Sequence, residues 1–192
     1  MAPRTRPSPA RERLLDSAVR VFARRGYHAT AVAEVLEVAG VPSGVLYHHF
    51  GSKEALAAEA VVRAGREVAA VFAEADGGVV DRLHALLDHW QRKLVDSGYV
   101  EGCPIACSAL ESVGAAPAVR DAAAAVYRGW IRGIAHGLRA EGCDGETAER
   151  EATVALAALE GGMLLARTTR STGPLDAARL VLDDVRRRHP VR

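Results

Sequence analysis

The sequence predicts an all-α protein of about nine helices. Along most of the 192 residues, apolar side chains recur at intervals of three and four, which is the period of an amphipathic helix. No segment alternates apolar and polar residues with the β-branched or aromatic enrichment that is typical of a strand. Hydrophobic residues make up 49% of the chain but aromatic residues only 5%, a composition that favours close helix packing over a β-sandwich.

The first predicted helix begins near residue 9. Ser8 is suited to act as its N-cap, and Pro9 is suited to the first helical position because its missing N–H needs no partner there. Leu15 and Phe22 belong to an apolar stripe along this segment, and Gly26 marks its end. We therefore expect one amphipathic helix between Ser8 and Gly26.

Two short helices are predicted next. Residues 31–39 follow Thr30, which we expect to act as the N-cap, and Gly40 can close this helix in the left-handed conformation. Residues 43–50 form a segment of barely two turns. Two short helices joined by a glycine-containing turn have the shape of a helix-turn-helix unit. Spacing alone leaves an ordinary αα-hairpin of a helical enzyme as an equal alternative.

Six longer amphipathic helices are predicted after residue 51. Caps and helix breakers mark their ends, namely Ser52, Gly77-Gly78, Ser97-Gly98, Pro104, Pro117, Asp144 and Gly173-Pro174. The first three helices are short and basic, whereas these six are longer and net acidic. We therefore predict a domain boundary near residue 51.

The charge of the chain is unevenly distributed. The formal net charge is +1, which by itself points to no nucleic-acid partner. Residues 1–53 contain eight basic and four acidic side chains, a net charge of +4, so the remaining residues carry −3. A basic head on a mildly acidic body indicates a polyanionic partner for one end of the chain only.

The composition disfavours several classes of protein. The longest apolar run, residues 154–166, is interrupted by Glu160 and two glycines, and it is shorter than the roughly 20 residues that span a bilayer. A hydrophobic signal segment does not follow the basic start, and three cysteines are too few for a disulfide scaffold. These features predict a cytoplasmic protein without membrane spans.

Two runs of residues resemble the signature of the TetR family of bacterial transcriptional repressors. They are residues 26–30, GYHAT, and residues 39–56, AGVPSGVLYHHFGSKEAL. The resemblance covers about residues 11–56 and involves about a dozen residues that agree in type and spacing. It implies an N-terminal three-helix DNA-binding domain, residues 1–51, and a C-terminal domain, residues 52–192, that binds an effector and forms a homodimer through the last two helices.

The resemblance also implies which residues contact double-stranded operator DNA. These are Thr30 as a helix cap that touches phosphate, Ser43, Gly44 and Val45 as base-reading residues, and Tyr47, His48 and Lys53 as phosphate contacts. Val45 stands where the family often has a small polar residue. Because no Arg or Lys lies on this recognition helix, bidentate reading of guanine by arginine is not available from it. We therefore expect phosphate contacts and a flexible arm with Arg4 and Arg6 to dominate, and the affinity to depend strongly on salt.

Three other residues of the recognition helix match structural positions. Leu46 and Phe50 match residues that pack the small core, and His49 matches a mostly structural residue. A metal site at His48 and His49 is not expected, because neighbouring side chains on a helix point about 100° apart.

A shorter run, residues 101–111 with the sequence EGCPIACSALE, is similar to the LmrA/YxaF-type branch, whose members control multidrug-resistance or small-molecule response genes. We expect a small apolar or aromatic effector in the C-terminal domain. The candidate pocket residues are Phe72, His84, Trp90, Cys107, Glu111, Tyr127, Trp130 and Met163. The alternative is that the large side chains of this set form ordinary core.

Two features have competing interpretations. Cys103 and Cys107 lie one helical turn apart, which suits a redox or metal sensor, although free cysteine more often behaves as a small buried hydrophobe. Gly161 and Gly162 in a helix each cost about 1 kcal/mol relative to alanine. A close helix crossing at a dimer interface would explain them, and the alternative is a kink beside a pocket.

An enzyme or ligand carrier is the main alternative class of function, and a protein-interaction bundle is another. Catalysis needs a converging set of groups, and the sequence contains no nucleophile elbow, glycine-rich phosphate loop or metal-ligand cluster. We therefore expect neither enzymatic activity nor a cofactor. The sequence favours a homodimeric repressor that leaves a pseudo-palindromic operator when its effector binds.

Overall fold

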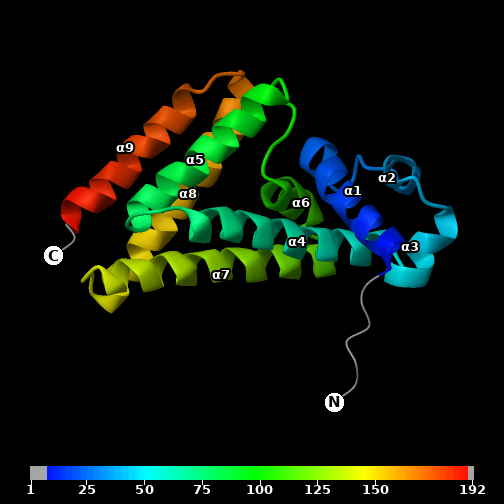
Figure 1. The fold of residues 1–192 in the computed structure, drawn as a ribbon, viewed down its shortest axis with the longest axis horizontal. Coiled ribbons are helices and arrows are strands. Elements are labelled where there is room, and N and C mark those ends of the chain that lie inside the picture. The colour runs from blue at the N-terminus through cyan, green and yellow to red at the C-terminus, as the bar shows by residue number, and fades with distance from the viewer. Residues whose placement is uncertain (1–7, 190–192) are drawn as a thin grey trace, which may run out of the picture. The chain divides into compact units, whose positions relative to one another are not determined.

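The computed structural model describes residues 8–189, and all nine regular elements in that range are helices (Figure 1). In chain order they are α1 (Pro9–Arg25), α2 (Val32–Ala39), α3 (Ser43–Phe50), α4 (Lys53–Glu74), α5 (Val79–Asp96), α6 (Pro104–Ser112), α7 (Pro117–Ala140), α8 (Gly145–Thr169) and α9 (Gly173–Arg188). The predicted all-α class is confirmed. Among these residues, no helix has both the length and the apolar character that crossing a membrane requires.

Most helix ends lie where the capping residues predict them. The Ser8 hydroxyl accepts a hydrogen bond from the Arg11 N–H at 3.2 Å, and the Asp144 carboxylate accepts one from the Thr147 N–H at 3.1 Å. Gly40 closes α2 with φ 60° and ψ 43°, a left-handed conformation that costs glycine little. Local sequence chemistry therefore sets these boundaries.

The predicted N-cap of α2 is wrong. Ala31 occupies this position, and no side chain caps the helix there. Thr30 is instead buried, and its hydroxyl donates to the Gly26 carbonyl oxygen at 2.7 Å. The hydroxyl therefore stabilises the turn between α1 and α2 and is not available to the start of α2.

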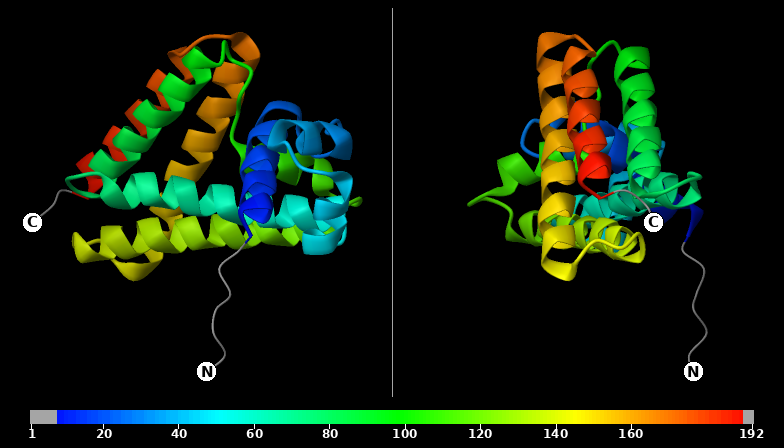
Figure 2. Two further views of the ribbon diagram at one scale, coloured as in Figure 1. Left: turned by 45° about the vertical axis from the view of Figure 1, so that its right-hand side comes forward. Right: turned by 90° about the vertical axis from the view of Figure 1, so that its left-hand side faces the viewer.

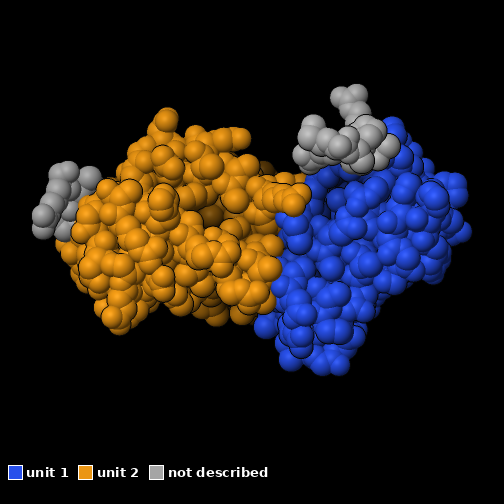
Figure 3. Space-filling view, turned by 90° about the horizontal axis from the view of Figure 1, so that it is seen from below, with its two compact units in different colours: residues 1–64, 104–123 blue, residues 65–103, 124–192 orange. Residues whose placement is uncertain are grey.

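Packing divides the chain into two compact units (Figure 3). The first unit consists of residues 1–64 and 104–123, and the second consists of residues 65–103 and 124–192. The start of α4 and all of α6 thus pack with α1, α2 and α3, and α4 and α7 each contribute to both units. The functional boundary near residue 51 stays a prediction, because compactness groups residues by contact and not by role.

The first unit is organised around α1, which packs against α2, α3 and α6. Its core contains the fully buried side chains of Leu14, Phe22, Leu46, Leu56 and Ile105. Burying these apolar groups favours folding by roughly 1.5–3 kcal/mol per large side chain before conformational entropy is subtracted. This core holds α2 and α3 in place.

In the second unit, α8 and α9 pair extensively, and α5 packs against both (Figure 2). Gly162 lies in the α8–α9 contact, where an added Cβ would be 3.1 Å from the Pro174 carbonyl oxygen and 3.2 Å from the Ala178 Cβ. The close crossing that Gly162 permits is therefore made within one chain and not between two copies. An added Cβ at Gly161 would meet no heavy atom within 4 Å among the described residues.

Candidate functional site

The two sides of α3 differ sharply in exposure. Leu46 and Phe50 are buried in the core of the first unit. Ser43, Gly44 and His48 are exposed, and Tyr47 is 61% exposed. The hydrophobic stripe of α3 therefore fixes the helix, while its other face presents two hydroxyl groups and an imidazole to solvent.

The first turn of α3 is open to close approach. An added Cβ at Gly44 would meet no described atom within 4 Å, so backbone can approach a ligand there. Pro42 is the N-cap and offers no side-chain hydrogen bond to the first N–H groups of α3. The predicted base-reading residue Val45 is only half-buried, so part of its side chain remains accessible.

Lys53 begins α4, three residues after α3 ends at Phe50, and is positioned by an aromatic ring. Its ammonium nitrogen lies 4.5 Å from the centroid of the Tyr27 ring, which is a cation–π contact. Partial burial lowers the pKa of Lys53, and the negative charge of Glu111 opposes this shift.

His49 and Thr30 hold the unit together instead of facing outward. The His49 Nε2 atom lies 3.1 Å from the Ser8 hydroxyl, which also caps α1, as expected for a structural residue. Only 1% of Thr30 is exposed, so its side chain lies inside the first unit, and its predicted phosphate contact stays a prediction. The expected arm residues Arg4 and Arg6 lie outside the described residues.

Glu111 and Cys107, two of the predicted pocket residues, lie on α6 in the first unit. The Glu111 carboxylate accepts a hydrogen bond from the His28 N–H at 2.6 Å, and the His28 Nε2 atom lies 2.8 Å from the Glu111 carbonyl oxygen. The Cys107 thiol donates to the Ala23 carbonyl oxygen at 3.8 Å. Both side chains thus attach α6 to the end of α1 and the turn that follows it.

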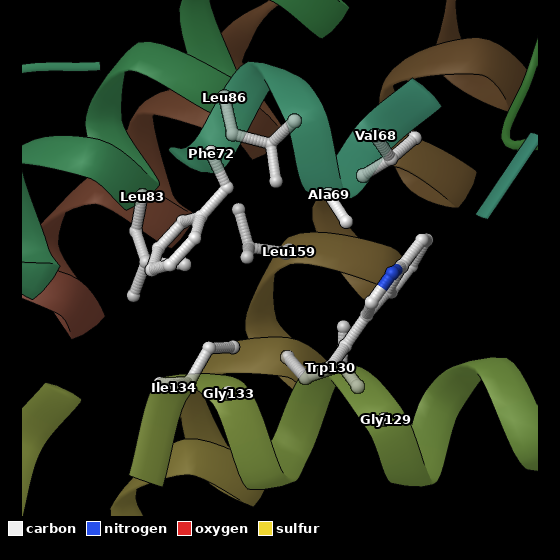
Figure 4. A pocket seen from close by; sticks show the side chains of 11 residues that line it. Val68, Ala69, Phe72, Leu83, Leu86, Gly129, Trp130, Gly133, Ile134 and Leu159 are labelled. Carbon is white, nitrogen blue, oxygen red and sulfur yellow. The ribbon is translucent and has the colours of Figure 1, made fainter. Parts of the chain in front are cut away.

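A cavity of about 100 Å³ lies in the second unit among α4, α5, α7 and α8 (Figure 4). Its walls are almost entirely apolar and are formed by Val68, Ala69, Phe72, Leu83, Leu86, Gly129, Trp130, Gly133, Ile134, Leu156 and Leu159. Phe72 and Trp130 are the two predicted pocket residues that line it. The Trp130 indole N–H donates to the Gly65 carbonyl oxygen at 3.1 Å, which fixes the ring beside the cavity.

The remaining predicted pocket residues in the second unit do not line this cavity. His84 on α5 pairs with Asp183 on α9 at 2.9 Å, and Trp90 and Met163 are buried core residues. The Tyr127 ring packs edge-to-face against the Trp130 ring, with centroids 5.7 Å apart. Tyr127 therefore does not line the cavity itself but contacts Trp130, which does.

Sequence analysis missed Glu160 as a functional candidate. The Cys103 thiol donates to Glu160 Oε1 at 3.2 Å, whereas Oε2 is buried and has no hydrogen-bond partner among the described residues. Burial raises the pKa of Glu160 to about 7, and hydrogen bonds from Cys103 and Tyr127 oppose the shift. The sequence feature that could have indicated Glu160 is a single carboxylate within the otherwise apolar segment that also contains Leu156.

Comparison with known proteins identifies the family. Residues 14–60 match the tetR family of bacterial regulatory proteins, and residues 79–180 match the C-terminal domain of LmrA/YxaF-like transcriptional regulators. The regulator Rv0196 of Mycobacterium tuberculosis is 40% identical over 172 residues, which cover 86% of this chain and 88% of that protein. This chain belongs to the TetR family.

Two further comparisons concern the sequence and the fold. LmrA of Bacillus subtilis, an HTH-type transcriptional regulator, is 32% identical over 170 residues, covering 86% of this chain and 90% of LmrA. A cysteine mutant of the TetR family regulator CifR, solved with 26-bp operator DNA, shares the fold with a TM-score of 0.73 and 24% identity, over 95% of this chain and 98% of CifR.

The family settles the class of function. This chain is a TetR-family DNA-binding transcriptional regulator, in agreement with the names of the matching families and relatives, which are regulatory proteins and transcriptional regulators. The predicted resemblance to the LmrA/YxaF-type branch is confirmed as well, because the C-terminal match is to that group.

Proposed function

We propose that this protein is a homodimeric repressor that binds a pseudo-palindromic operator through α3 and is released by a small effector. The observation that carries the proposal is the two-sided character of α3. Its inner face is buried against α1, while Ser43, Gly44, Tyr47 and His48 face solvent. A helix held in this way enters the major groove with its first turn nearest the base edges.

The chemistry of this face favours phosphate contact over base reading. Tyr47 and His48 carry groups that hydrogen-bond phosphate oxygens, and Lys53 adds a point charge. Ser43, Gly44 and Val45 are the proposed base contacts. Since phosphate contacts release counterions, the affinity should fall steeply as salt is added.

The DNA contacts are tested by fluorescence anisotropy with an operator selected from a genomic DNA pool. Tyr47→Ala and Lys53→Ala should each weaken binding at least about tenfold, because each removes a phosphate contact. Lys93→Ala is the matched control, since Lys93 is exposed on α5 in the second unit. Circular dichroism checks that each variant is folded. Unchanged binding by both folded variants, or an affinity independent of salt, would refute the proposed interface.

The proposed homodimer uses the outer surface of α8 and α9. Leu164 and Leu165 on α8 are each 55% exposed, and Leu180 on α9 is 67% exposed. Large apolar side chains exposed together on two paired helices are typical of a surface that associates. Leu165→Glu combined with Leu180→Glu should give a monomer in light scattering, whereas Val113→Glu, at an exposed site in the first unit, should not.

The proposed effector site includes the apolar cavity of the second unit. Ala69 is exposed on α4 yet lines the cavity, so Ala69→Phe would partly fill it. We expect this variant to bind operator normally but to need more of an apolar effector for release. Ala73→Phe, exposed on the same helix, is the matched control. Equal sensitivity of the two variants to effector would exclude this cavity as the site.

A further inference from the structure

Glu160 is a half-buried residue whose carboxyl oxygen Oε2 is fully buried, and no positive charge compensates the carboxyl group. The two groups that hydrogen-bond its carboxyl, the Cys103 thiol and the Tyr127 hydroxyl, are both neutral. Oε2 has no hydrogen-bond partner among the described residues, and no positively charged group contributes to the shift in the pKa of Glu160. Burying a carboxylate without a counter-charge costs free energy. Its negative charge and the unpaired Oε2 atom together favour the binding of a cationic hydrogen-bond donor.

Glu160 does not line the apolar cavity itself, but residues on α7 and α8 connect it to the cavity wall. On α8 it follows cavity-lining Leu156 by one turn, so the two side chains share a face of the helix. On α7, Tyr127 reaches the carboxyl group and packs against Trp130, whose ring borders the cavity (Figure 4). In the second unit, Trp130 lines the cavity, Tyr127 packs against Trp130, and Tyr127 hydrogen-bonds the Glu160 carboxyl group.

The cavity is too small to hold a complete drug-like molecule by itself. Its volume of about 100 Å³ is below the roughly 300–1,000 Å³ of ordinary ligand pockets and near the roughly 150 Å³ that accommodates benzene. It therefore suits one apolar or aromatic fragment. A larger ligand would extend past Trp130 toward Tyr127 and Glu160, where aromatic faces also attract a cation.

We propose that Glu160 is the charged end of the effector site and selects protonated amines that are joined to an aromatic or aliphatic body. The ammonium N–H groups bind Oε2 and balance the carboxylate, and the apolar body occupies the cavity lined by Phe72 and Trp130. This inference rests on the proposed function, because it assigns the chemical class of the effector. The sequence predicted a small apolar or aromatic effector, and we propose that this effector also carries a positive charge.

A series of matched probes tests the selectivity. 2-Phenylethylamine, the neutral 2-phenylethanol and the anionic 3-phenylpropionate share one ring and differ in the charge of the end group. Binding to the full-length chain is measured by calorimetry at about pH 8, above the pKa of about 7 that burial gives Glu160. The amine should bind at least about tenfold more tightly than the alcohol, since a charge-assisted hydrogen bond is stronger than a neutral one.

Glu160→Gln removes the charge while it keeps the shape of the side chain. The variant should lose the preference for amine over alcohol, whereas Glu146→Gln, at an exposed site on the same helix, should keep it. Equal affinity for amine and alcohol in the unaltered protein would overturn the proposal, and so would a preference that survives in Glu160→Gln.

Operator release, followed by anisotropy with the same probes, separates this inference from the proposed function. Amine binding that depends on Glu160 but does not release operator would support the ligand site and contradict effector-controlled repression. Release by neutral aromatic compounds together with no selective amine binding would support the repressor mechanism and refute the role of Glu160.

Discussion

Glu160→Gln should change the pH dependence of folding stability. In the folded protein, burial raises the pKa of this carboxyl to about 7, whereas its ordinary value is 4.5. At low pH the carboxyl is protonated in both the folded and the unfolded state, so its ionisation does not lower the free energy of unfolding. As the pH rises from about 4.5 to about 7, the unfolded chain releases the proton more readily, and the folded state loses stability.

The size of the effect follows from the shift in pKa. Each unit corresponds to about 1.4 kcal/mol, so the ionised carboxyl should destabilise the folded state by about 3 kcal/mol above pH 7 relative to pH 4.5. Glutamine does not ionise. The free energy of unfolding of Glu160→Gln, relative to that of the unaltered protein, should therefore rise by about 3 kcal/mol over this range.

Urea unfolding at a series of pH values, followed by circular dichroism at one protein concentration, measures this difference. Glu146→Gln serves as the control because its side chain is exposed on α8, and its stability should follow that of the unaltered protein throughout. A difference between Glu160→Gln and the unaltered protein that stays constant from pH 4.5 to 8 would show that the carboxyl is not buried as described, and our reasoning would fail.

Three further substitutions test packing and capping in chemical denaturation. Gly162→Val should destabilise the second unit by roughly 1–3 kcal/mol because the α8–α9 crossing leaves no room, whereas Gly161→Ala, at the neighbouring site on α8 without close heavy atoms, should be neutral or stabilising by up to about 1 kcal/mol. Glu111→Ala should cost about 1–3 kcal/mol, since it leaves the His28 N–H without its charged acceptor; no loss of stability would argue against this attachment of α6. Ser8→Ala should cost about 1 kcal/mol by removing the N-cap of α1, and an unchanged unfolding midpoint would contradict the capping geometry.

The buried and exposed faces of α3 were largely predictable from sequence. The exposure of Tyr47 and His48 and the burial of Leu46 and Phe50 follow from helical periodicity within eight residues. The cavity of the second unit was less predictable. Side-chain size and polarity suggested eight pocket candidates, but the cavity is lined by two of them, because which face of a long helix meets a void depends on the helices around it.

The sequence by itself determined the helices, most of their caps, the position of the proposed recognition helix and the basic head, because each depends on neighbouring residues. Only the tertiary structure decided that the Thr30 hydroxyl turns inward, that Glu111 belongs to the first unit and that Gly162 serves a crossing within the chain. It also decided the environment of Glu160, whose hydrogen-bonding groups, Cys103 and Tyr127, are 57 and 33 positions away along the chain. Burial and pKa depend on all atoms that surround a group in space, and local sequence does not specify those atoms.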